Sequence, residues 1–272
     1  MRLIAIAAGT FGVMLLAGVA PAFAIDVTSL ASDGSPDVWQ DGTSNNQTRN
    51  GGTATISSEQ SLDGDGALRL YTPDSTGKAT ALFTGSTPLG DLEALSEISY
   101  QYYRDSSSTN PGAQAPALRL YVSDGQGRNG ILIYEPAYNG VDPIPEDSWQ
   151  TVFADLDNGN WWLFEGGVFE NFGLTLDDWL SDDVFAGPGG PKSGFGENAL
   201  VLGIDVGIGS GWAGEALAYV DNVLISFVVD DQAQSTVWNF QAAATEVPEP
   251  ATLALMGAGL AGLYLVRRRR RS

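Results

Sequence analysis

Chemistry in this 272-residue chain must come from carboxylates, hydroxyls, amides and aromatic rings, because the sequence contains no His and no Cys. This composition excludes Cys-ligated zinc, thiol nucleophiles, Ser-His-Asp triads and disulfide frameworks. What remains is 33 acidic residues together with 7 Trp, 9 Tyr and 11 Phe. Flat rings and hydrogen-bonding carboxylates are the groups needed to recognise a polyhydroxylated ligand such as a glycan.

Two of the aromatic residues are the candidates for such a binding surface. Tyr138 and Trp162 both lie next to polar turns that contain Gly and Asn. For any single ring, packing in a hydrophobic core is the commoner role. Across the whole set, however, we expect at least one ring to be exposed. We therefore predict that Tyr138 and Trp162 contact glycan, with core packing as the alternative for each.

A calcium site is a second candidate, at Asp155 and Asp157. The run Asp-Leu-Asp-Asn-Gly-Asn resembles the first half of a calcium-binding loop, which supplies closely spaced hard oxygens. A full EF-hand is not expected: Glu165 falls at the distance of its last ligand, but Trp161 and Trp162 before it are predicted to be in a strand. A plain β-turn explains the same residues equally well.

Catalysis is the rival to binding. Without His or Cys, the natural reaction for such a chain is glycan cleavage by two carboxylates. Glu135 lies at the end of a predicted strand, but no motif pairs it with a second acidic residue on the same strand. We therefore predict a non-catalytic protein and keep a polysaccharide-active enzyme, a glycoside hydrolase or lyase, as the alternative.

The elements that would position these residues are mostly strands. Alternating apolar and polar residues predict strands, and Gly- and Asp-rich turns separate them. The expected strands cover residues 67–71, 79–83, 98–102, 117–122, 130–134, 149–154, 160–164, 199–208, 215–227 and 236–240. One short helix is expected at residues 175–180, with Thr175 and Asp178 forming a capping box. The pattern predicts an all-β protein, a single antiparallel β-sandwich of jelly-roll type.

Both ends of the chain carry targeting features. Residues 1–24 combine Arg2, an apolar run and a terminal Ala-Phe-Ala, which predicts a signal peptide cleaved by signal peptidase. Near the other end, an apolar segment at residues 251–266 predicts a short transmembrane helix. The positive-inside rule keeps the arginines after it in the cytoplasm. They are Arg267, Arg268, Arg269, Arg270 and Arg271.

A four-residue motif before the apolar segment indicates which kind of targeting signal the C-terminal region carries. Val247, Pro248, Glu249 and Pro250 precede the Gly-containing apolar segment and the Arg cluster in strict order. Residues 247–272 resemble the PEP-CTERM sorting signal. The resemblance implies processing by an exosortase after export across the inner membrane of a Gram-negative bacterium. It also implies a cell-surface or extracellular destination, with membrane contact only through the C-terminal segment before processing.

The body of the chain shows a weaker resemblance. The run Ala-Tyr-Val-Asp-Asn-Val-Leu-Ile at residues 218–225 is similar to the closing strand of galactose-binding-like and other carbohydrate-binding jelly rolls. This resemblance implies a β-sandwich that binds sugar and holds a structural calcium. The domain plan is therefore a signal peptide (1–24), a β-sandwich (25–229), a final strand and linker (230–246) and the sorting signal (247–272).

Charge narrows the choice of partner. Without Arg2 and the five C-terminal arginines, the chain keeps seven basic against 33 acidic residues, a net charge of −26 (7 − 33). Such a field repels phosphate backbones and so excludes nucleic acid. The resulting hypothesis is an exported glycan-binding or structural protein of the exopolysaccharide or biofilm matrix. Its partners would be signal peptidase and exosortase during export, and extracellular polysaccharide afterwards.

Overall fold

The computed structural model describes residues 23–187, 190–211 and 213–243. Most of the predicted signal peptide, the Val-Pro-Glu-Pro motif, the apolar segment and the Arg cluster lie outside these residues. Within the described part, no helix is long and apolar enough to span a membrane. Strands and core residues all lie between Phe23 and Phe240, in a compact unit that ends at Ala242.

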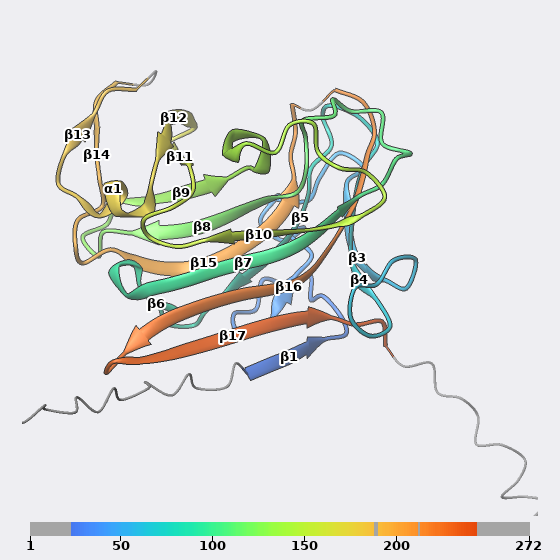
Figure 1. Cartoon of the computed structure of the whole chain (residues 1–272), viewed down its shortest axis with the longest axis horizontal. Helices are drawn as coiled ribbons and strands as arrows, with labels where there is room; N and C mark the ends of the chain where they lie inside the picture. The colour runs from blue at the N-terminus through green and yellow to red at the C-terminus, as the bar shows by residue number, and fades with distance from the viewer. Residues whose placement is uncertain (1–22, 188–189, 212, 244–272) are drawn as a thin grey trace, which may run out of the picture. The chain divides into compact units, whose positions relative to one another are not determined.

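Two β-sheets face each other across one hydrophobic core (Figure 1). The described part of the first sheet has seven strands: β1 (Phe23–Val27), β17 (Gln232–Phe240), β16 (Ala216–Val229), β4 (Ala67–Thr72), β3 (Thr53–Ser57), β7 (Leu95–Arg104) and β10 (Trp149–Ala154). The described part of the second has eight: β12 (Val168–Leu174), β11 (Trp161–Glu165), β9 (Asn129–Tyr134), β8 (Ala117–Ser123), β15 (Leu200–Ile208), β5 (Ala79–Thr84), β2 (Trp39–Gln40) and β6 (Gly90–Asp91). The all-β sandwich prediction is confirmed.

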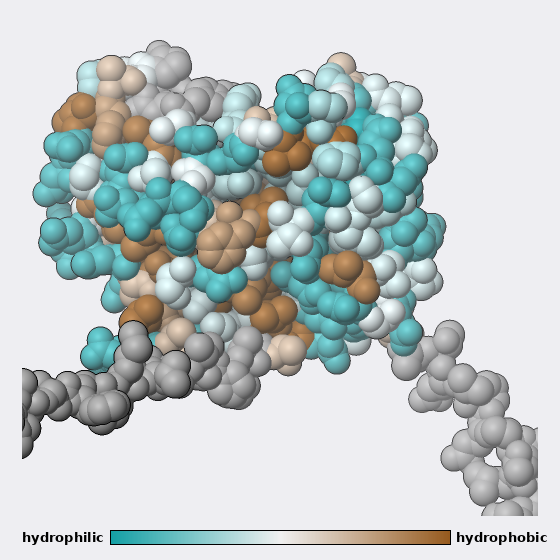
Figure 2. All heavy atoms as spheres, in the orientation of Figure 1, coloured by the Kyte–Doolittle hydropathy of each residue, from teal (hydrophilic) through white to brown (hydrophobic). Residues whose placement is uncertain are grey.

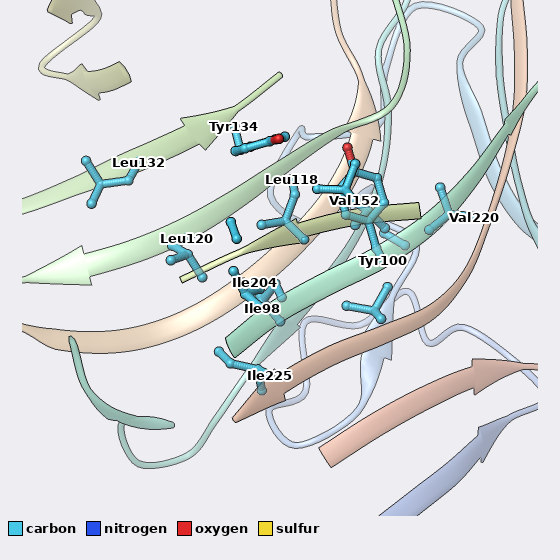
Figure 3. Close-up of a cluster of buried hydrophobic side chains, with 14 of the residues drawn as sticks. Ile98, Tyr100, Leu118, Leu120, Leu132, Tyr134, Val152, Ile204, Val220 and Ile225 are labelled. Atoms are coloured by element: carbon cyan, nitrogen blue, oxygen red, sulfur yellow. The ribbon is translucent and has the colours of Figure 1, made fainter. Parts of the chain in front are cut away.

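The core forms because each strand turns alternate side chains inward. In Figure 3, side chains from β7, β10 and β16 meet those from β8, β9 and β15. Tyr100 and Tyr102 are each only 1% exposed, while Tyr103 lies on the opposite face of β7. The buried Tyr100 hydroxyl donates to the carbonyl of Pro116 at 2.6 Å, so its polar atom is satisfied.

The first sheet forks along β16, its longest strand. The first half of β16 pairs with β4 and the second half with β17, while β7 runs along its other edge. The fork lies at Asp221 and Asn222, where the register shifts and Asn222 has a φ of 48°. Asp221 accepts hydrogen bonds from the amides of Asn222 and Phe240, at 2.8 and 3.0 Å. This buried carboxylate thus ties the end of β17 to the fork.

The short elements include one confirmed prediction. Helix α1 (Leu176–Leu180) starts at the capping box of Thr175 and Asp178. The other short elements are the 3₁₀ helices η1 (Leu92–Ala94) and η2 (Pro136–Asn139) and the hairpin of β13 (Val184–Phe185) and β14 (Lys192–Ser193).

Strand β1 was not expected from the sequence. It pairs in parallel with β17, from Phe23 opposite Thr236 to Val27 opposite Phe240. Phe23 and Ala24, assigned to the signal peptide from the sequence, thus open a strand of the sandwich. Trp238 and Phe240, assigned to the final strand and linker, are 4% and 0% exposed and belong to the main core.

Candidate functional site

The outer face of the eight-stranded sheet carries a row of side chains that point away from the main core. The strand registers place Trp162 beside Ile133, Ile133 beside Arg119, Arg119 beside Asp205, and Asp205 beside Leu82. The row therefore crosses β11, β9, β8, β15 and β5. Its apolar end, Trp162 and Ile133, forms a small cluster separate from the main core. Two charged residues stand at its centre.

Arg119 and Asp205 form a buried ion pair in this row. The guanidinium Nε lies 2.5 Å from the carboxylate Oδ1, and the two residues are 6% and 0% exposed. The hydroxyl of Tyr121 donates to the other oxygen of Asp205 at 2.7 Å, and Arg119 donates to Thr80 Oγ1 at 3.1 Å. Burial raises the pKa of Asp205, an effect that the nearby cations oppose. Both residues are buried, so the two charges satisfy each other inside the protein.

Glycine makes room for this pair. Gly207 lies beside Ala117 on one neighbouring strand and Thr80 on the other. A Cβ at position 207 would collide with Arg119 Nη2, and would lie 2.6 Å from both the Ala79 carbonyl oxygen and Thr80 Oγ1. The guanidinium therefore occupies the space that a side chain at this position would fill.

Lys78 adds a second cation beside the pair. Its Nζ donates to Oε1 of Gln47, and the side chain is half-buried. Burial, assisted by the positive charge of Arg119, lowers the pKa of Lys78 to about 7. Lys78 therefore changes its charge near neutral pH, which makes this part of the face sensitive to pH.

The predicted residue Tyr138 lies at the end of the same sheet. It belongs to η2, which follows β9, and its side chain is 52% exposed. Three hydrogen bonds connect η2 to Asn160, the residue before β11. The Asn160 amide N–H donates to Asn139 Oδ1 at 2.6 Å, Asn160 Nδ2 donates to the Tyr138 carbonyl at 3.0 Å, and Asn139 Nδ2 donates to the Asn160 carbonyl at 3.2 Å. Burial and then the charge of Glu135 raise the pKa of Tyr138. Glu135 is half-buried, and burial raises its own pKa against the opposing effect of Arg119.

The other predicted aromatic residue, Trp162, lies in the row but is largely covered. It is 7% exposed and packs with Ala117 and Ile133. Trp161 points the other way into the main core, with its ring 5.3 Å from that of Tyr134. The alternation of the two tryptophans is as expected. The structure thus brings Tyr138, Glu135 and Trp162 to one sheet, with Tyr138 as the exposed ring.

Asp155 and Asp157 form a tight turn after β10. Oδ1 of Asp155 accepts hydrogen bonds from the amides of Asp157 and Asn158, both at 2.9 Å, as in an Asx turn. Among the described residues, no group of three or more acidic side chains is close enough to hold a metal ion. Calcium at Asp155 and Asp157 stays a prediction.

Sequence reasoning missed Arg119, Asp205 and Lys78. Arg119 and Asp205 are the only charged residues in their strands. A lone charge in an otherwise apolar strand was therefore the available signal, but the pairing of residues so distant in sequence was not visible.

Comparison with known proteins gives one match in sequence and several in structure. Residues 246–271 match the PEP-CTERM protein-sorting motif. No curated protein matches the chain in sequence. Among solved structures, a carbohydrate-binding module of the β-sandwich superfamily is similar over 63% of this chain, with 14% identity and a TM-score of 0.30. An exo-β-agarase is similar over 74%, with 12% identity and a TM-score of 0.35.

The globular domain of T. cruzi calreticulin is similar over 71% of the chain, with 16% identity and a TM-score of 0.34, and 85% of that domain is covered. The chain spans 52% of the carbohydrate-binding module structure and 24% of the agarase. The sequence motif is the informative match. It marks this chain as an exported protein that is sorted by an exosortase.

Proposed function

We propose that the processed protein is a non-catalytic glycan-binding component of the extracellular polysaccharide matrix. The glycan would lie along the outer face of the eight-stranded sheet, beginning at Tyr138. The observation that carries the proposal is the 52% exposed ring of Tyr138 beside the half-buried carboxylate of Glu135. The ring supplies a face for the C–H surface of a sugar, and the carboxylate accepts hydrogen bonds from its hydroxyls.

The charge of the protein selects among glycans. The acidic body repels uronate-rich or sulfated chains, so we propose neutral polysaccharides as the ligands. Arg119 is buried and already donates to Thr80, so the half-buried Lys78 is the cation that would supply donors on this face, beside the acceptor Glu135. A neutral glycan would therefore meet both donors and acceptors there. In the precursor, we propose that the membrane is contacted only through the C-terminal segment.

The test uses the body, residues 23–245, after its cooperative unfolding has been confirmed. Tryptophan fluorescence is followed while neutral and acidic exopolysaccharides are added. Tyr138→Ala is expected to weaken binding roughly tenfold or more, as the loss of an aromatic anchor does. Phe153→Ala is the matched control, because Phe153 is 53% exposed on the other sheet. The absence of binding to any glycan, or equal losses in both variants, would contradict the proposal.

Two further arms of this experiment address the alternatives. A calcium ion at the Asp155 turn would be supported if the wild type loses glycan binding in EDTA and regains it when calcium is added. Calcium should then fail to restore binding in Asp155→Asn or Asp157→Asn. Overnight incubation followed by analysis of chain length tests catalysis. Shortened products that disappear with Glu135→Gln would replace the binding proposal with a glycan-cleaving enzyme, since burial keeps the Glu135 pKa raised as a general acid requires.

A further inference from the structure

A pocket of about 480 Å³ opens between the two sheets at one edge of the sandwich. Its walls come from β1 and β17 of the first sheet and from β2 and β5 of the second, together with the segments beside them. This volume lies within the range of roughly 300–1,000 Å³ typical of small-molecule sites. The pocket is distinct from the proposed glycan surface, because it lies between the sheets rather than on an outer face.

Aromatic rings line part of the pocket, beside polar residues such as Ser29 and Thr236. Trp39, Phe83 and Trp238 line it, and their ring centroids lie 4.9 to 5.9 Å apart. Trp39 and Trp238 meet edge to face at 83° and are 2% and 4% exposed. Their rings pack against one another, so they offer little flat face on which a sugar could stack. Such walls suit a flexible hydrocarbon chain better than a sugar ring.

The mouth of the pocket exposes apolar side chains. Ile25 is 47% exposed and Val38 is 44% exposed, and both line the pocket. They are among the few large hydrophobic side chains that the described part of the chain leaves in solvent. A ligand in the pocket would remove the side chains of Ile25 and Val38 from water. Figure 2 shows how hydrophilic side chains surround the apolar ones on one face of the molecule.

The charges at the pocket exclude anions. Among the described residues, the charged ones that line it are Asp26 and Asp37. Hydrogen bonds from the side chain and backbone of Ser86 lower the pKa of Asp37, so that this carboxylate is ionised at neutral pH. A fatty-acid carboxylate would therefore meet two negative charges and no positive one. The head of the ligand must be neutral or cationic.

We propose that this pocket binds the aliphatic chain of an uncharged amphiphile. The chain would enter past Ile25 and Val38 and lie against the Trp39 and Trp238 rings, while its neutral head would remain at the mouth near Asp37. This site is independent of the proposed glycan function, since none of the glycan-binding candidates lines it.

The test titrates the body, residues 23–245, with 1-alkanols from butanol to decanol by calorimetry. Each added methylene that enters the pocket is expected to lower the Kd about fourfold, the factor set by burying one CH₂ group. The gain should stop when the pocket is full. Octanoate is expected to bind at least tenfold more weakly than octanol, because of the two carboxylates at the mouth.

A matched pair of variants locates the binding. Val38→Glu is expected to weaken octanol binding tenfold or more. Val228→Glu is expected to leave it unchanged, because Val228 has the same 44% exposure but does not line the pocket. Equal effects of the two variants, a Kd that ignores chain length, or no alkanol binding would each overturn the proposal. None of these results would affect the glycan titration.

A final arm of the experiment tests whether the aliphatic ligand comes from a membrane lipid or from a free amphiphile. Phosphatidylcholine vesicles are sedimented with the body and with both variants. Co-sedimentation that Val38→Glu abolishes and Val228→Glu preserves would support the proposal and identify membrane lipid as the source. Saturable alkanol binding without co-sedimentation would support it with a free amphiphile. The proposal would be overturned if the wild type binds no alkanol and Val38→Glu still co-sediments with the vesicles, because the lipid contact would then lie outside the pocket.

Discussion

On the outer face of the seven-stranded sheet, three aromatic residues stand side by side across β10, β7 and β16. The rings of Trp149, Tyr103 and Tyr219 have successive centroid distances of 5.8 and 5.9 Å. The hydroxyls of the two tyrosines donate to exposed carboxylates, Tyr219 to Glu59 at 2.8 Å and Tyr103 to Asp147 at 3.3 Å. On the eight-stranded sheet, the corresponding row instead buries an ion pair. One outer face is therefore covered by packed aromatic rings, and the other by side chains that include a buried ion pair.

The two outer faces differ in the desolvation cost of their packing. Neutral rings with hydrogen-bonded hydroxyls pack at little desolvation cost. A buried guanidinium and carboxylate must both be removed from water, and replacing such a pair with apolar residues is often neutral or stabilising. The Arg119–Asp205 pair is therefore weak evidence for a stabilising role. Both residues of the pair are buried, whereas the neighbouring Lys78 and Glu135 are only half-buried, so solvent reaches those two charged groups more readily.

The largest expected effect comes from breaking that pair. Arg119→Ala leaves Asp205 buried without its cation, which should lower the free energy of unfolding by about 3–5 kcal/mol. The exposed pair of Arg69 and Glu59, at 2.9 Å on the other face, should lose only about 0–1 kcal/mol in Arg69→Ala. Urea denaturation of both variants measures the contrast. Equal losses would mean that the two faces do not differ in the cost of their charges.

The strands could be predicted from the sequence more completely than the site. Alternation revealed the strands that flank the ion pair, because each buries one face, and the capping box located α1. The parallel strand β1 escaped, because its partner β17 lies at the other end of the chain. Strand β3, residues Thr53–Ser57, is rich in small polar residues and mostly uncovered, so no hydrophobic period marked it.

The site was less visible, because it depends on registers between strands distant in sequence. Tyr138 could be proposed from its position beside a turn, and the structure leaves it exposed. Trp162 had the same local signal but is covered by neighbours that the sequence alone does not bring together. The inter-sheet pocket combines β1, β2, β5 and β17, and local pattern cannot reveal such a combination.

A smaller effect is expected from filling the space beneath Arg119. Gly207→Ala introduces a methyl group against Arg119, Ala79 and Thr80, and overpacking of this kind costs about 1–3 kcal/mol. The matched control is Gly209→Ala, since a Cβ at Gly209 would meet nothing within 4 Å. Thermal unfolding of the two variants separates the steric cost from the general effect of replacing glycine. A stable Gly207→Ala variant would show that Arg119 moves aside freely.

The smallest expected effect is a pH dependence confined to the charged face. The pKa of Lys78 is about 7 in the folded protein, below its ordinary value of 10.5 in the unfolded chain. Between these values the unfolded chain binds more protons, so this residue makes the free energy of unfolding rise as pH rises above 7. From pH 7 to pH 8.5, the difference between wild type and Lys78→Met should change by about 1.6 kcal/mol.

The aromatic face supplies the control for this comparison through Arg69, because arginine side chains in general do not titrate near neutral pH. Arg69→Met should therefore leave the slope of stability against pH unchanged, whereas Lys78→Met should reduce it. Urea denaturation at a series of pH values measures both slopes. If the Lys78→Met slope matches that of the wild type, Lys78 is fully charged near neutrality, and the face around Arg119 is more open to water than its burial implies.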